Sequence, residues 1–251
     1  MKTFIFFIAL LSMSFSFAQN IEVVYSRKYT LTPEHEKFRK YFTAQALKEL
    51  QKKEYLFLVK SNNSTLFYPV RRPENTKIVD TVRTSEHSIH IYENKFAQEM
   101  SIYYINYANN FYLKKYINSF GKKFDIKDSI PKLKWTILRE TDKMHGYKTQ
   151  KATTMYQNMK IIAWFAEDIP ISIGPKIFAG LPGLIMKLKM GVATYEVEKI
   201  KFLKIPPLIT PPKPYGNHYL TNQEYLIISK KNSIKSSITT KDCPTCPDNN
   251  K

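Results

Sequence analysis

Between residues 54 and 203 the chain is a succession of short runs in which apolar and polar residues alternate, and this pattern constrains the fold most strongly. Turn-forming residues separate the runs, for example at 61–64 and 145–146. A period of two places apolar side chains on one face of a strand, and tight turns join antiparallel neighbours. With only 7 Gly but 17 Tyr and 16 Phe, the composition also favours strands. We predict an α+β, mainly β fold built on an antiparallel sheet that is strongly curved or partly closed.

Some details of this sheet can be predicted as well. Residues 88–92 and 101–107 are expected to pair with each other around Glu93-Asn94. Apolar residues change parity between Val197 and Ile200, which predicts a β-bulge near residues 198–199.

Two segments have helical features. Thr32 and Pro33 form a helix start, and Phe38, Phe42, Ala46 and Leu50 then recur every four residues. This predicts one long N-terminal helix over residues 33–53, packed on the sheet. A shorter helix is expected from Thr221 to about Lys231.

The N-terminus is typical of a secretory signal peptide. It combines Lys2, an apolar run over residues 4–11 and a small-residue ending at Ala18. Residues 1–19 are therefore predicted to be removed, leaving a single domain over residues 20–231 and a polar, disordered tail over 232–251. The expected location is the periplasm, with an extracellular location as the alternative. The formal charge of +18 favours anionic partners, among them an anionic membrane surface, and nucleic acid is not expected in that compartment.

The densest local motif runs from Trp164 to Ile185. Its last part, Gly180-Leu181-Pro182-Gly183-Leu184-Ile185, suits a type II turn between two core strands. In such a turn Pro182 fixes φ at the second position and Gly183 supplies a positive φ at the third, while Gly180 permits close backbone approach.

These six residues spell GLPGLI, and the chain resembles the GLPGLI family of Bacteroidetes envelope proteins. The tight resemblance covers residues 135–185, including Trp135 and the stretch 146–153. It departs from the family pattern at Thr149, where many members have Cys. The resemblance implies an exported protein without an established activity, associated with outer-membrane transport systems. A weaker similarity to periplasmic lipoprotein carriers implies a curved sheet around an apolar cavity.

From these features we expect a non-enzymatic binding or carrier protein for an apolar or amphipathic ligand, or an accessory to an outer-membrane transporter. Candidate ligand-binding residues at the mouth of a pocket are aromatic and apolar side chains in and before the motif: Trp164, Phe165, Ile169, Pro170, Phe178, Leu181 and Leu184. The first alternative is a basic interaction module that docks on a partner protein or an anionic membrane, and the second is an envelope hydrolase or metal-handling protein.

The residues that could carry chemistry fit no catalytic or metal-binding pattern. Serine-hydrolase and phosphate-loop motifs do not occur, and the neighbouring Glu167 and Asp168 are expected to be solvated loop charges. Cys243 and Cys246 form a CxxC pair that could be a local disulfide, a redox couple or a soft-metal site. A disulfide is favoured because no helix start follows the pair and two of the four usual zinc ligands are missing. No cofactor is expected.

Overall fold

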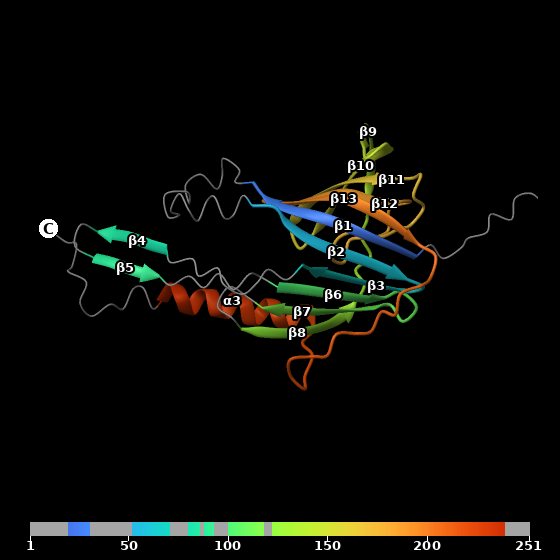
Figure 1. Ribbon diagram of the computed structural model, residues 1–251. Helices are drawn as coiled ribbons and strands as arrows, with labels where there is room; N and C mark the ends of the chain where they lie inside the picture. The colour runs from blue at the N-terminus through green and yellow to red at the C-terminus, as the bar shows by residue number, and fades with distance from the viewer. Residues whose placement is uncertain are drawn as a thin grey trace, which may run out of the picture.

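The computed structural model describes residues 20–30, 52–70, 80–85, 88–92, 100–117 and 122–238 (Figure 1). They form an 11-stranded antiparallel sheet with the order β8-β7-β6-β3-β2-β1-β13-β12-β11-β10-β9. Its strands are β1 (Asn20–Tyr29), β2 (Glu54–Ser61), β3 (Ser64–Pro69), β6 (Met100–Asn106), β7 (Phe111–Ile117), β8 (Lys123–Ser129), β9 (Thr136–Met144), β10 (Tyr147–Tyr156), β11 (Met159–Ala166), β12 (Leu184–Met190) and β13 (Ala193–Leu203). The predicted mainly β, antiparallel architecture is confirmed.

One predicted strand pair is wrong. β5 (Ser88–Tyr92) pairs with β4 (Asp80–Ser85) in a separate two-stranded sheet, whereas β6 pairs with β3 and β7. The sequence of β4 is mostly polar, so alternation of apolar and polar residues does not indicate a strand there. Without β4 as a candidate partner for β5, the next alternating segment, β6, is the nearest choice.

The two predicted helices have different outcomes. The helix over residues 33–53 lies outside the described residues, except for Lys52 and Lys53, which lead into β2 and are not helical. The second helix is confirmed as α3 (Asn222–Ile238).

A reciprocal capping box begins α3. The Glu224 carboxylate accepts the backbone N–H of Thr221 at 2.7 Å, and the Thr221 hydroxyl accepts that of Glu224 at 3.2 Å. No Pro or Gly follows within the helix, so a helix that has started here continues through polar residues to Ile238. The helix therefore extends beyond Lys231, where its end was predicted, to Ile238.

The N-terminal strand β1 lies in the middle of the sheet, between β2 and β13. Its register with β13 passes from Val24–Lys199 to Tyr25–Val197, so Glu198 is the extra residue of a β-bulge. The bulge predicted near residues 198–199 is confirmed.

Ring contacts show that the sheet curves strongly. Phe67 on β3 and Tyr195 on β13 are three strand spacings apart, which is about 14 Å in a flat sheet. Their ring centroids are nevertheless 6.2 Å apart. The buried side chains of the two halves therefore meet on one concave side, which we call the inner face, and the opposite side is the outer face.

The β9–β10 hairpin folds toward the same side. Its two-residue turn has positive φ at both His145 (49°) and Gly146 (86°), as a tight hairpin requires. The imidazole Nε2 of His145 lies 2.6 Å from the backbone carbonyl oxygen of Val197 on β13, and this acceptor requires the proton on Nε2. Since β10 is three strands from β13, this bond joins distant parts of the curved sheet.

The edge at β8 is covered by the chain that follows β13. The Asp125 carboxylate accepts the backbone N–H groups of Tyr215 (2.6 Å) and Gly216 (3.1 Å). Leu220 then forms a parallel bridge with Ile126, and α3 continues beside β8 (Figure 1). None of the described helices is long and apolar enough to cross a membrane.

Candidate functional site

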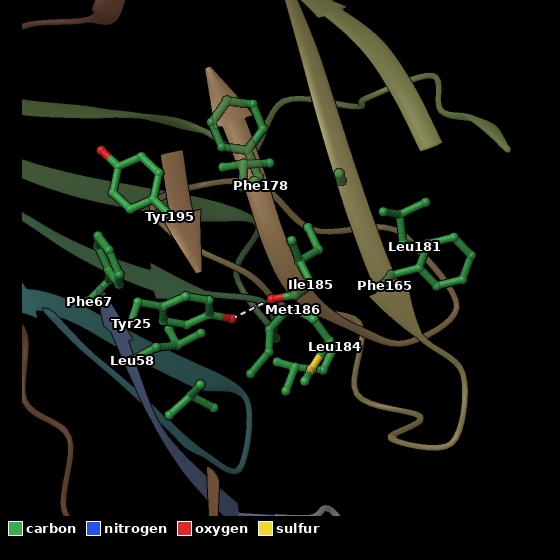
Figure 2. Packing of buried hydrophobic residues seen from close by; sticks show 14 of the residues in the cluster. Tyr25, Leu58, Phe67, Phe165, Phe178, Leu181, Leu184, Ile185, Met186 and Tyr195 are labelled. Carbon is green, nitrogen blue, oxygen red and sulfur yellow. Dashed lines mark hydrogen bonds between the residues drawn. The ribbon is translucent and has the colours of Figure 1, made fainter. Parts of the chain in front are cut away.

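The segment between β11 and β12, which carries the GLPGLI string, packs inside the curved sheet. Backbone hydrogen bonds hold it there, because Leu184 donates to the Ile169 carbonyl at 3.0 Å and Ile185 donates to that of Ile173 at 3.0 Å. Its apolar side chains are at most 5% exposed: Ile169, Ile171, Ile173, Ile177, Phe178, Leu181, Leu184 and Ile185. The segment therefore supplies a large part of the hydrophobic core (Figure 2).

The roles predicted for Gly180 and Gly183 are exchanged in the structure: Gly180 adopts the positive φ, and Gly183 permits the close backbone approach. Gly180 has the positive φ, +94°, whereas Gly183 is not among the residues with positive φ. A Cβ added at Gly183 would lie 2.0 Å from the carbonyl oxygen of Ala166, so this position requires glycine for close backbone approach. The predicted type II turn with positive φ at Gly183 is wrong, because the packing of residue 183 against β11 determines the local backbone.

Polar contacts fix the start of the motif. The Trp135 indole N–H donates to the Ala179 carbonyl at 2.9 Å, and the Gly180 N–H donates to the Ser172 hydroxyl at 2.9 Å. The indole also lies 3.8 Å from where a Cβ of Gly180 would be. Trp135 is thus a structural support for the motif.

The end of the motif is tied to β1 by a buried hydrogen bond. The register of β11 and β12 shifts between Trp164–Lys187 and Phe165–Ile185, which marks an irregularity at this point. The Ile185 carbonyl accepts a hydrogen bond of 2.6 Å from the Tyr25 hydroxyl, shown as a dashed line in Figure 2. Burial raises the pKa of Tyr25 well above its usual value, so the hydroxyl keeps the proton that it donates.

Replacing Tyr25 with phenylalanine is expected to lower the free energy of unfolding by about 1–3 kcal/mol, because the buried Ile185 carbonyl loses its donor. Urea denaturation of both proteins measures the change. Tyr55→Phe is the matched control, since Tyr55 is 47% exposed, and it should leave the midpoint nearly unchanged. Equal midpoints for Tyr25→Phe and the wild type would show that the bond does not stabilise the fold.

The structure places most of the predicted ligand-binding residues inside the core. Phe165, Ile169, Phe178, Leu181 and Leu184 are at most 2% exposed. Pro170 is exposed, as are Pro182 and the carboxylates of Glu167 and Asp168. The buried residues thus pack inside the protein, and ligand binding by them stays a prediction.

Trp164 lies on the outer face, away from Phe165, because consecutive strand residues point to opposite faces. The ammonium groups of Lys151 and Lys187 lie 5.5 and 5.8 Å from its ring centroid. Each lysine is also paired with a carboxylate, Lys151 with Glu140 at 2.6 Å and Lys187 with Glu196 at 3.7 Å. Trp164 therefore belongs to a ladder of charges across β9 to β13.

Two further positions bear on the chemistry expected from the sequence. Thr149 is 1% exposed, and its hydroxyl has no hydrogen-bond partner among the described residues. Cys243 and Cys246 lie outside the described residues. Across the described part of the chain, no group of three or more His, Cys, Asp or Glu residues could hold a metal ion.

A different set of side chains converges at the centre of the inner face. We define the inner-face cluster as the tyrosines 103, 112, 156 and 195 with the lysines 114 and 176. Tyr103 and Tyr195 each pack against the ring of Phe67, at 6.4 and 6.2 Å between centroids. Tyr156 reaches the same region from β10 and packs edge-on against Phe178 at 5.7 Å. The cluster thus joins both halves of the curved sheet.

The electrostatics indicate that the four phenols are close to one another. Burial raises the pKa of Tyr103 well above its usual value, and repulsion from the three other phenols raises it further. Burial also raises the pKa of Tyr112, with contributions from Tyr156 and Asp128. The hydroxyls of Tyr103 and Tyr112 therefore remain protonated and can donate hydrogen bonds.

Two lysines bring positive charge to the phenols. The Lys114 ammonium lies 5.8 Å from the ring centroid of Tyr103 and 4.3 Å from that of Tyr116. Lys176 lies 5.4 Å from the ring centroid of Tyr195 and has φ of +58°, which is unusual for a residue other than glycine. Tyr103, Tyr112 and Tyr195 are buried, whereas Lys114, Tyr156 and Lys176 are half-buried.

The inner-face cluster could not be found from local sequence patterns. Its members come from β6, β7, β10, β13 and the loop after β11, and only the curvature brings them together. The available signal was compositional, namely the abundance of tyrosine and lysine.

A comparison with protein-family models finds a match for only part of the chain. Residues 121–187, which include the GLPGLI string, match the family model described as "Protein of unknown function (Porph_ging)". No curated protein matches the chain.

Among solved structures, PNGF-II in space group P21 is similar over 85% of this chain and 33% of its own, with 19% identity and a TM-score of 0.50. PNGF-II in space group C2 is similar over 75% of this chain and 28% of its own, with 18% identity and a TM-score of 0.47. The chain thus spans about a third of the length of the PNGF-II chains. At this identity the P21 match supports the fold alone, and residues 121–187 resemble a domain whose function is unknown.

Proposed function

We propose that the protein is a non-enzymatic binding protein of the GLPGLI type, exported to the periplasm, that holds an amphipathic ligand on the inner-face cluster. The observation that carries the proposal is the convergence of four tyrosines and two lysines from distant strands on one concave face. This moves the ligand site from the motif, whose apolar side chains fill the core, to the half-buried Lys114, Tyr156 and Lys176, which lie beside the buried tyrosines.

The chemistry of the cluster suits a ligand with an apolar part and an anionic group. Tyrosine offers a large apolar ring together with a hydrogen-bond donor, so it can contact both parts of such a ligand. Lys114 and Lys176 supply positive charge beside these donors, and the net charge of +18 attracts anions to the molecule. The half-buried Lys114, Tyr156 and Lys176 are the members that a ligand would contact first.

Equilibrium binding of dodecyl phosphate, measured by isothermal titration calorimetry below its micellar concentration, tests this function. We expect Lys114→Met and Lys176→Met to weaken binding about 10-fold or more each, because a charged partner of the anion is lost. Lys199→Met is the matched control, since Lys199 is exposed and opposite Val24 of β1, and it should bind like the wild type.

Dodecyl maltoside, which has the same chain and a neutral head, measures the apolar contribution separately. The function is contradicted if neither amphiphile binds, or if the lysine variants on the inner face and the control variant bind equally well. Native mass spectrometry of the protein purified from its own cells would identify the natural ligand.

A further inference from the structure

The segment that leaves β13, residues 204–214, carries the most exposed large apolar side chains named in the described part of the chain. Leu208 is 91% exposed and Ile205 is 81% exposed, and Phe202 at the end of β13 is 51% exposed. We call residues 204–214 the connector. At this exposure Ile205 and Leu208 bury little apolar surface against the protein, so they contribute little to the stability of the fold.

Proline stiffens the connector and sets the direction of these side chains. Pro206 and Pro207 separate Ile205 from Leu208, and Pro211, Pro212 and Pro214 follow. Prolines fix φ and keep the preceding residue extended, which favours a polyproline II backbone with three residues per turn. Residues three apart lie on the same side of such a helix, so this backbone would place Ile205 and Leu208 on the same side.

Both ends of the connector are anchored. It begins directly after β13, and at its other end the Lys115 ammonium donates to the Lys213 carbonyl and packs on the Tyr215 ring at 3.7 Å. Asp125 holds the next two backbone N–H groups. Figure 1 shows this orange segment running from the end of β13 past the ends of the strands towards α3. The apolar side chains are thus presented on a stiff loop.

Exposed lysines surround the apolar pair. Lys201 lies at the end of β13, and Lys204 and Lys213 begin and nearly end the connector. Between residues 201 and 214 the sequence contains no acidic residue. Apolar side chains beside lysines are the combination that binds an anionic membrane surface, where the side chains enter the headgroup region and the lysines attract lipid phosphates.

We propose that the connector is a membrane-docking loop, in which Ile205 and Leu208 insert into the surface of an anionic bilayer and Lys201, Lys204 and Lys213 contact its phosphates. This goes beyond ligand binding on the inner face, since it would bring the binding protein to a lipid surface. It depends on a different part of the molecule, so either proposal can fail alone.

Co-sedimentation of the mature chain with phosphatidylglycerol–phosphatidylcholine vesicles tests the loop, with pure phosphatidylcholine vesicles as the neutral surface. We expect binding to the anionic vesicles that falls about 10-fold or more in the double variant Ile205→Ser/Leu208→Ser. Met155→Ser is the matched control, because Met155 is 62% exposed on β10, and it should bind like the wild type.

The charged part is tested with Lys204→Gln/Lys213→Gln, which should weaken binding and reduce its dependence on salt. The proposal is overturned if the chain does not bind anionic vesicles, or if binding is lost with salt but unaffected by the serine substitutions. It is also overturned if Leu208 is needed only for binding a protein partner. Because the substituted side chains are exposed, circular dichroism should show an unchanged fold in every variant.

Discussion

Gly183→Ala should destabilise the protein by more than about 3 kcal/mol, the largest effect that we expect from a single methyl group in this chain. The added Cβ would lie 2.0 Å from the Ala166 carbonyl oxygen and 2.6 Å from its carbon. Both atoms belong to the backbone of β11, so the clash cannot be relieved by rotating a side chain. Urea or thermal denaturation of the purified variant measures the loss.

Gly216→Ala is the matched control for this substitution. A Cβ at Gly216 meets nothing within 4 Å, and Gly216 has no positive φ. The control should therefore keep the wild-type midpoint. A stable Gly183→Ala protein would show that β11 and the motif can separate at little cost, which would contradict the close approach as the reason for glycine.

Alkaline pH should destabilise the fold steeply because of its buried tyrosines. Burial raises the pKa of Tyr25 and Tyr103 above the value near 10 of an unfolded chain, and it raises the pKa of Tyr107 to about 12. The folded state then retains protons that the unfolded state releases. This stabilisation is complete below pH 10 and is lost as the pH rises above it.

Above the unfolded pKa each such group lowers the free energy of unfolding by about 1.4 kcal/mol per pH unit, so Tyr25 and Tyr103 together lower it by about 3 kcal/mol per pH unit. Urea midpoints at a series of pH values between about 9 and 11 measure the slope. Tyr25→Phe should reduce it by about 1.4 kcal/mol per pH unit. A midpoint that does not change over this range would contradict the protonated, buried state of these phenols.

Sequence patterns were sufficient for elements that local chemistry determines. The bulge at Glu198, the hairpin turn at His145-Gly146 and the capping box of Thr221 and Glu224 each depend on residues close together in the chain. In these cases the backbone conformation, the hydrogen-bond partner and the apolar period are encoded within a few residues.

Features that depend on distant neighbours were missed or misread. The residues around Gly183 have a turn-like sequence, but the backbone at Gly183 is determined by its packing against Ala166 on the adjacent strand. β8 was not predicted, because its buried Asp125 interrupts the apolar pattern, and one oxygen of that carboxylate accepts two backbone N–H groups about ninety residues later. The inner-face cluster was not predicted for the same reason, since its tyrosines are brought together by the curvature of the sheet and not by their spacing in the sequence.

The central position of β1 has a consequence for the order in which the chain can fold. Its hydrogen-bonding edge on one side is completed by β13, which lies at the far end of the sheet's sequence. During synthesis from the N-terminus, one edge of β1 lacks its hydrogen-bonding partner until β13 has been made. Such non-local pairing makes folding slow.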